Sequence, residues 1–174
     1  MINTLRYTKG LDVYMKRNAD RADTRPPEIA SRARWMSILA RATRAELDNA
    51  WTALPERPSY ELLRHPEIGL AMVRGRAGGT GNPFNLGEMT ITRCAVRLSD
   101  GTVGHCYAAG RDKKKAELAA VFDALLQGPL RLRLESELIA PLKRRQAADR
   151  ALASRKAAAT KVEFFTMVRG DNPR

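Results

Sequence analysis

The sequence predicts an α+β fold, in which an antiparallel sheet is built around one hairpin and covered by helices. The hairpin is indicated by Asp100-Gly101 between two alternating runs, because a type I′ turn needs residues that accept positive φ. An amphipathic helix follows directly, and further helices are predicted near both ends of the chain. A hairpin that leads into such a helix is the start of an α+β layer.

Taken as a two-residue loop, this turn fixes which residues face each other across the hairpin. Leu98 is then opposite Val103, and Val96 is opposite His105. Side chains alternate along a strand, so these four residues share one apolar face. His105 is therefore expected to be a hydrogen-bonded core histidine rather than a general base. The other face is expected to hold small residues and two arginines.

Both cysteines lie in the hairpin, and the same register puts Cys94 opposite Tyr107. Cys94 and Cys106 then fall on opposite faces, so no disulfide is expected between them. Two thiols without nearby histidines are too few for a zinc or iron–sulfur site. The sequence contains no Ser-His-Asp set, Cys-X-X-Cys pair or metal-binding helix motif. We therefore predict no catalytic or metal-ligating residue in this chain.

Two helices are predicted before the sheet. Residues 28–42 carry apolar side chains at helical spacing. A second helix begins at Thr43, where Thr43 and Glu46 have the spacing of a capping box, and it ends at Pro55. Such a pair either packs on the core, which its apolar stripes favour, or forms an arm that binds a partner.

The helix after the hairpin has signals at both ends. Asp112 is a good N-cap, and apolar residues recur at helical spacing as far as Leu126. Gly128-Pro129 is predicted to close the helix, with the glycine in the left-handed conformation and the proline unable to continue.

Two strands are predicted ahead of the hairpin, over residues 60–64 and 67–76. His65-Pro66 is expected to separate them, and His65 is interpreted as structural. A glycine-rich loop is predicted over residues 75–88, leading into the hairpin.

After Pro129 the sequence predicts a long helix to about residue 161, with a break or kink at Pro141. Its later part has high helix propensity but few apolar anchors, so it is expected to be solvated or to lie on a partner. Residues 162–168 then alternate with apolar weight on both faces. Such a strand at a chain end is either a buried edge or a strand donated to another protein.

Size and composition favour one domain. The chain has 174 residues, of which 44% are hydrophobic, enough for a single core. We assign that domain to residues 28–174 and treat residues 1–27, which are polar, as a flexible extension. No apolar run reaches the about 18 residues of a membrane span, and no signal peptide is recognised. A cytoplasmic location without membrane association is expected.

The net charge of +12 suggests nucleic acid as a partner. The distribution of the charge weakens that interpretation. Residues 131–161 hold nine basic and three acidic side chains, whereas residues 28–130 hold fourteen basic and eleven acidic ones. The excess is therefore concentrated in one late helix, and no aromatic residue is interleaved with its cations to stack on bases. A basic nucleic-acid-binding protein remains the alternative function, although the pattern disfavours it.

Three stretches are candidates for contact with phosphate. The first is Gly78-Gly79-Thr80-Gly81, because glycines let backbone amides approach an anion, although a flexible turn is the plainer interpretation. The second is Arg111 and Lys113 at a helix N-terminus, where free amides and cations could hold a phosphate, or where the charges are simply solvated. The third is Arg93 with Arg97 on the same face of the hairpin, and these arginines could equally pair with acidic groups on a partner.

Several motifs together resemble the PhnG family, a subunit of the carbon–phosphorus lyase core complex. The resemblance covers about residues 30–172 in order, and the terminal FFTMVRGD is its most specific piece. It also includes the stretches Glu67-Ile-Gly-Leu70, Gly78-Gly-Thr-Gly81, Gly87-Glu-Met-Thr90, Gly110-Arg-Asp112 and Ile139-Ala-Pro-Leu142. The resemblance implies nothing about the N-terminal extension, residues 1–27.

The resemblance implies a hetero-octamer with two copies each of PhnG-, PhnH-, PhnI- and PhnJ-like subunits. That complex displaces adenine from ATP, used with magnesium, by an alkylphosphonate and forms α-D-ribose 1-(alkylphosphonate) 5-triphosphate. The family places this step on PhnI and the later radical cleavage on PhnJ, which has the cluster cysteines. This chain is thus expected to be a structural subunit without a cofactor of its own. Four terminal residues are candidate partner contacts: Phe164, Phe165, Met167 and Arg169.

Overall fold

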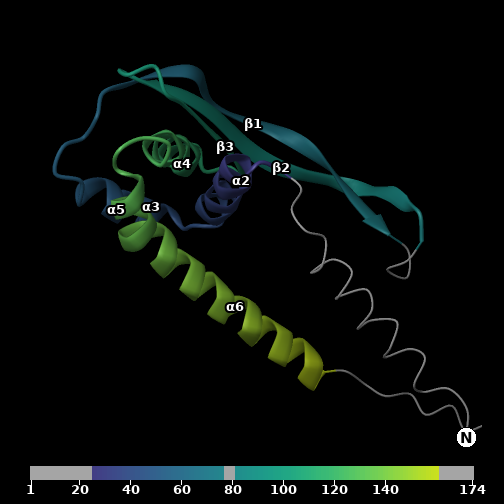
Figure 1. Ribbon diagram of the computed structural model, residues 1–174. Coiled ribbons are helices and arrows are strands. Elements are labelled where there is room, and N and C mark those ends of the chain that lie inside the picture. Colours follow the sequence, from purple (N-terminus) through teal and green to yellow (C-terminus); the bar gives the residue numbers. More distant parts are fainter. Residues whose placement is uncertain (1–24, 77–80, 161–174) are drawn as a thin grey trace, which may run out of the picture.

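The computed structural model describes residues 25–76 and 81–160, and its architecture confirms the α+β class (Figure 1). The elements in chain order are α2 (Pro27–Ala40), α3 (Arg44–Thr52), β1 (Tyr60–Arg76), β2 (Pro83–Leu98), β3 (Val103–Ala109), α4 (Lys113–Leu125), α5 (Arg131–Leu134), the π-helical turn η2 (Glu135–Ile139) and α6 (Ala140–Ala159).

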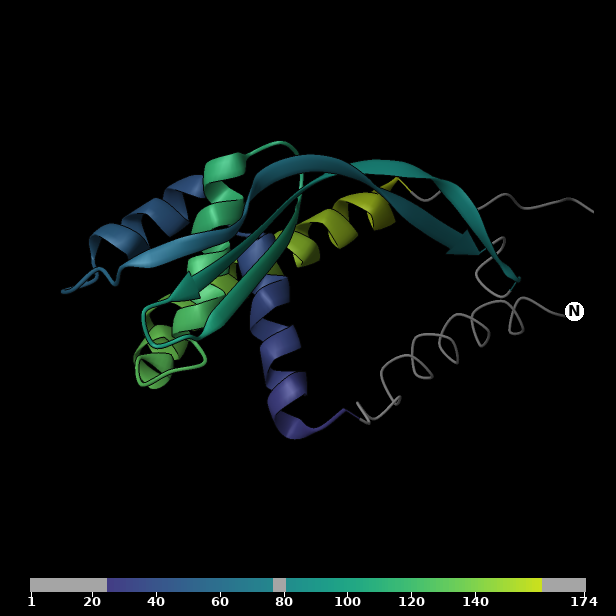
Figure 2. The same ribbon diagram turned by 90° about the horizontal axis from the view of Figure 1, so that it is seen from above.

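The sheet has three antiparallel strands in the order β1-β2-β3. Helix α4 packs against one face of it, with α2 and α3 beside α4, and α6 extends away from this body (Figures 1 and 2). The core lies between α4 and the sheet and is centred on Phe122, Leu118 and Val96, which are fully buried. Nine of the thirteen residues of α4 are buried, so α4 is the central helix rather than a surface one.

The two N-terminal helices form as predicted, and both pack on the core. Pro27 occupies the first turn of α2, where its missing N–H costs nothing. Thr43 and Glu46 make the capping box of α3: the Glu46 amide donates to the Thr43 hydroxyl at 3.3 Å, and the Thr43 amide donates to the Glu46 carboxylate at 2.8 Å. The predicted N-cap of α4 is also confirmed, because Asp112 accepts from the Lys115 amide at 2.9 Å.

The hairpin forms at the predicted place, but its predicted register is wrong by one residue. The loop has three residues, 99–101, and Leu98 rather than Ser99 faces Thr102, whose carbonyl accepts from the Leu98 amide at 2.9 Å. Gly101 takes φ of 85°, which suits a type I turn closed by a glycine bulge. The Asp100 carboxylate accepts from the Thr102 amide and so favours this longer turn.

The shifted register reverses the two faces of β3. His105 is exposed on the outer face and is not the core histidine that the sequence predicted. Cys106 lies directly opposite Cys94, and both are buried on the same face, so the predicted separation of the cysteines is also wrong. Both thiols are nevertheless free.

Gly104 gives the physical reason for this register. A methyl group at its Cα would collide with the carbonyl oxygen of Ala120 and the amide of Ala124, because α4 crosses the sheet at this point. Only glycine allows so close an approach of helix and strand. In the predicted register Gly104 would have faced outward, and the inward position would have held a larger side chain.

Two expectations for the second half of the sheet are also wrong. β1 continues through His65-Pro66 as one strand, and only its pairing with β2 shifts there. The glycine-rich stretch over residues 75–88 is mostly strand, because β1 runs to Arg76 and β2 starts at Pro83. Backbone pairing between the two strands outweighs the low strand propensity of the glycines.

The C-terminal helix is interrupted, but ahead of Pro141. The interruption is the π-helical turn η2, and Pro141 lies in the first turn of α6, where it is tolerated. Gly128 was expected in the left-handed conformation, and this is wrong: among the described residues positive φ occurs at Gly101 and Gly110. The predicted strand over 162–168 and most of the predicted extension 1–27 lie outside the described residues.

Candidate partner-binding surfaces

Arg111 and Lys113 lie exposed at the start of α4. The preceding Gly110 takes φ of 95°, and its amide donates to the Thr90 carbonyl at 2.9 Å, which ties this turn to β2. In the first turn of α4, the Lys115 amide already donates to the Asp112 carboxylate. The turn therefore presents two exposed cations that have no carboxylate partner among the described residues, where an anion from outside the chain can reach them.

The other predicted phosphate contacts lie elsewhere. Gly81 is at the tip of the β1–β2 ribbon, where its carbonyl accepts from Arg76 at 3.0 Å, and Gly78 and Gly79 are outside the described residues. Because a strand rises about 3.3 Å per residue, this tip is about 25 Å from the strand end that holds the Arg111 turn. Arg93 donates to Glu67 at 2.6 Å on the outer face of the sheet. The structure thus places these residues in three separate positions.

β1 and β2 continue beyond β3 as a two-stranded arm, for which we take residues 68–76 of β1 and 83–90 of β2 (Figure 2). At its base, Ile68 and Gly69 still pair with β2 residues that pair with β3. One face of the arm continues the core face of the sheet, because Ile68 pairs with the buried Thr92. Its opposite face carries apolar residues too. The large apolar side chains that are exposed on the arm are Ile68, Leu70, Met72, Phe84, Leu86 and Met89.

Exposure of apolar side chains on both faces is unusual for a two-stranded ribbon. Leu70 is 64% exposed on the face that continues the core, and Leu86 is 66% exposed on the other, near Gly75. Isolated two-stranded ribbons are only marginally stable in water, and contiguous apolar patches mark interaction sites. The arm has the properties of an element that another protein covers.

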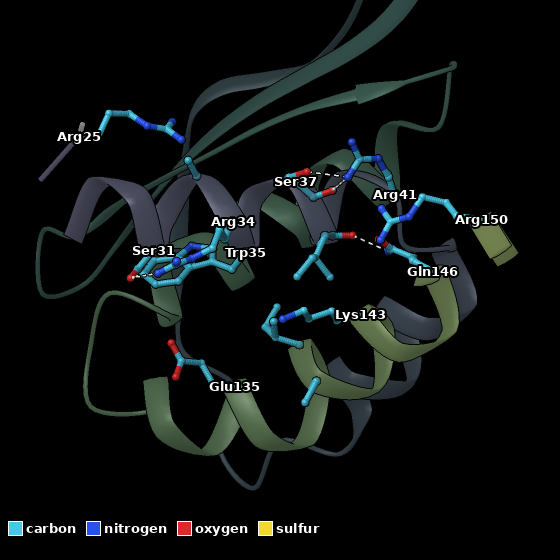
Figure 3. A pocket seen from close by; sticks show the side chains of 14 residues that line it. Arg25, Ser31, Arg34, Trp35, Ser37, Arg41, Glu135, Lys143, Gln146 and Arg150 are labelled. Carbon is cyan, nitrogen blue, oxygen red and sulfur yellow. Dashed lines mark hydrogen bonds between the residues drawn. The ribbon is translucent and has the colours of Figure 1, made fainter. Parts of the chain in front are cut away.

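A second surface is a groove of about 530 Å³ between α2 and the η2–α6 helix (Figure 3). Arg34 and Arg41 line it from α2, and Lys143 and Arg150 line it from α6. Figure 3 shows Lys143 extending into the space between the two helices. Sequence reasoning missed this groove, because its cations come from segments about 100 residues apart. The available signal is the repeated spacing of seven residues, which puts each pair on one helix face.

The two thiols of the core, Cys94 and Cys106, are expected to be unreactive. Burial, and secondarily the charge of Glu117, raises the pKa of Cys94 to about 11. Burial also raises the pKa of Cys106 to about 12. Both groups are therefore protonated at neutral pH, and a neutral buried thiol is a weak nucleophile and a weak metal ligand. These cysteines act as small core residues.

Within residues 25–76 and 81–160, no group of three or more His, Cys, Asp or Glu side chains is arranged to hold a metal ion. No helix in the same ranges has the length and apolar composition needed to cross a membrane.

The fold and these surfaces define a class of protein: an α+β chain with an apolar arm and a basic groove, both suited to contact with other macromolecules. A family model described as "Phosphonate metabolism protein PhnG" matches residues 30–170. The chain belongs to the PhnG family. Among its curated relatives is a protein of Rhizobium meliloti (strain 1021), "Alpha-D-ribose 1-methylphosphonate 5-triphosphate synthase subunit PhnG". It is 47% identical over 144 residues, which cover 83% of this chain and 92% of the relative.

Proposed function

We propose that this chain is a subunit of an α-D-ribose 1-methylphosphonate 5-triphosphate synthase and serves in phosphonate breakdown. The observation that carries the proposal is the 47% identity with the Rhizobium meliloti subunit, which extends over 92% of that protein. Identity of this extent across nearly the whole relative indicates that the aligned region of both proteins is the same domain.

In the proposed reaction, an oxygen of the alkylphosphonate attacks the anomeric carbon of the ribose of ATP, and the bond to adenine breaks. The product is α-D-ribose 1-(alkylphosphonate) 5-triphosphate, and magnesium accompanies the triphosphate. We assign the chemistry to a partner subunit and an assembly role to this chain. The protonated core thiols and the exposed apolar arm support that division of labour. Arg111 and Lys113, with the tip glycines and Arg93, are the groups proposed for contact with phosphate.

The proposed partners are PhnH-, PhnI- and PhnJ-like subunits in a hetero-octamer. Apolar area on both faces of the arm supports an obligate assembly, because permanent interfaces are more hydrophobic than transient ones.

Co-purification tests the proposed assembly. The chain is co-expressed with PhnH-, PhnI- and PhnJ-like proteins from one operon, with a tag on this chain alone, and is purified at 0.3 M NaCl. All three are expected to elute with it in fixed ratio, because contacts dominated by apolar area resist salt. Elution of this chain without them, together with steeply salt-dependent binding to arbitrary duplex DNA, would contradict the proposal and favour the nucleic-acid alternative.

A further inference from the structure

The groove between α2 and α6 has a basic rim that no described carboxylate neutralises. Arg34 donates to the Ser31 hydroxyl at 2.8 Å, and Arg41 donates to the Ser37 hydroxyl at 2.6 Å. Among the described residues none of the four rim cations, Arg34, Arg41, Lys143 and Arg150, has a carboxylate partner.

This contrasts with the arginines close by on the same helices. Arg145 of α6 pairs with Glu46 and Asp149, and Arg32 of α2 pairs with Asp123. Glu135, the one acidic residue of the groove, is engaged by Arg131 at 3.0 Å. The hydroxyl contacts orient Arg34 and Arg41 but leave their charge uncompensated, so the rim attracts an anionic ligand.

The floor of the groove is apolar. It includes Ile38 of α2, Ile139 of η2 and Ala140 of α6, while Gln146 closes it by donating to the Ile38 carbonyl at 2.9 Å. A free phosphate chain would satisfy the rim but would leave this floor in contact with water. A ligand that fits both features has apolar groups between two rows of carboxylates.

The geometry of the rim also suggests the shape of the ligand. On each side two cations are seven residues apart, which is about 10 Å along a helix. Arg41 and Arg150 lie at one end of the groove, and Arg34 lies at the end formed by η2 (Figure 3). Two turns of a helix have the same length, and an amphipathic helix carries its apolar stripe between flanking polar rows.

We propose that this groove binds an acidic amphipathic helix of another subunit of the same synthase, with its carboxylates on Arg34, Arg41, Lys143 and Arg150. The inference deepens the proposed function and rests on it. The groove would be a second contact, separate from the apolar arm and sensitive to salt.

Charge reversal in the co-expressed complex tests the groove. The double variant K143E/R150E reverses two rim cations, and R144E/R155E reverses two exposed cations of α6 that do not line the groove. Both variants change the net charge equally. K143E/R150E is expected to weaken binding to the other subunits at least tenfold at 0.15 M NaCl, and R144E/R155E less than threefold. Equal effects of the two variants, or no effect of either, would overturn the inference.

Zero-length carbodiimide cross-linking identifies the occupant. In the wild-type complex Lys143 is expected to cross-link to Asp or Glu on a helix of a neighbouring subunit. Cross-links from Lys143 to residues 1–24 of this chain would overturn the inference, because the chain would then cover its own groove. Competition of the cross-link by tripolyphosphate, with assembly of K143E/R150E unchanged, would assign the groove to a small anion instead. If the wild-type chain binds none of the other subunits, the proposed function is wrong, and this inference is wrong with it.

Discussion

Replacement of Asp123 by alanine is expected to lower the free energy of unfolding by about 3–5 kcal/mol. Asp123 is completely buried in α4 and accepts from three residues in two other elements of the fold. Its carboxylate accepts from Arg32 at 2.8 Å, from the indole of Trp35 at 2.8 Å and from the backbone amide of His105 at 2.9 Å. One side chain thus joins α2, α4 and β3.

The large expected effect follows from what the alanine variant leaves behind. The Trp35 indole and the His105 amide would lose their acceptor inside the protein, and each unsatisfied buried donor costs about 1–3 kcal/mol. The Arg32 guanidinium would lose its counter-ion in a partly buried position. Urea unfolding of the isolated chain measures the difference. Asp149→Ala is the matched control, because its pair with Arg145 is at the surface and should cost less than about 1 kcal/mol. Equal losses in the two variants would contradict a structural role for the Asp123 network.

The double substitution L70D/L86D is expected to weaken assembly with the other synthase subunits about 100-fold or more. The two leucines lie on opposite faces of the arm, so the change acts whichever face is covered. Interface residues at the centre of a contact are worth about 2 kcal/mol or more each, and about 1.4 kcal/mol corresponds to a tenfold change in affinity. A carboxylate would also have to be buried without a partner.

The control for the arm is Leu132→Asp on α5, because Leu132 is 81% exposed and far from the arm in sequence. Size-exclusion chromatography of the co-expressed subunits gives the fraction assembled. Thermal unfolding of the isolated variants checks that the body of the fold is intact. Normal assembly of L70D/L86D, or equal loss with Leu132→Asp, would show that the arm is not the covered surface.

What could be predicted from the sequence was local. The capping box at Thr43 and Glu46 and the N-cap at Asp112 depend on neighbouring residues, and both are present in the structure. The resemblance to the PhnG family was predicted from short motifs and is confirmed by the family match over residues 30–170.

What could not be predicted depends on contacts between distant parts of the chain. The turn residues Asp100-Gly101 are compatible with a loop of two residues or of three. The close approach of α4 to Gly104 requires the three-residue loop. The burial and the partners of Asp123, an acidic residue in an apolar stretch, could not be predicted. Its partners Arg32 and Trp35 are about 90 residues away in the sequence. The arm was interpreted as a loop, since glycines seldom dominate strands and only cross-strand pairing stabilises them here.

The candidate site was predicted least well. Arg111 and Lys113 are exposed as a phosphate contact requires, yet Gly81 is at the far end of the arm and Arg93 is paired with Glu67. The predicted contacts at Phe164, Phe165, Met167 and Arg169 lie outside the described residues and stay predictions. The groove has no local motif, because it exists only once α2 and α6 are side by side.

We expect the synthase to need this chain although another subunit performs the reaction. The most direct measurement is adenine release from ATP and methylphosphonate, with magnesium, by the purified subunits with this chain present or omitted. Adenine and the ribosyl 5-triphosphate product are expected only when this chain is present, and none from this chain alone. Full adenine release without this chain would contradict its requirement, and release by this chain alone would contradict its assembly role.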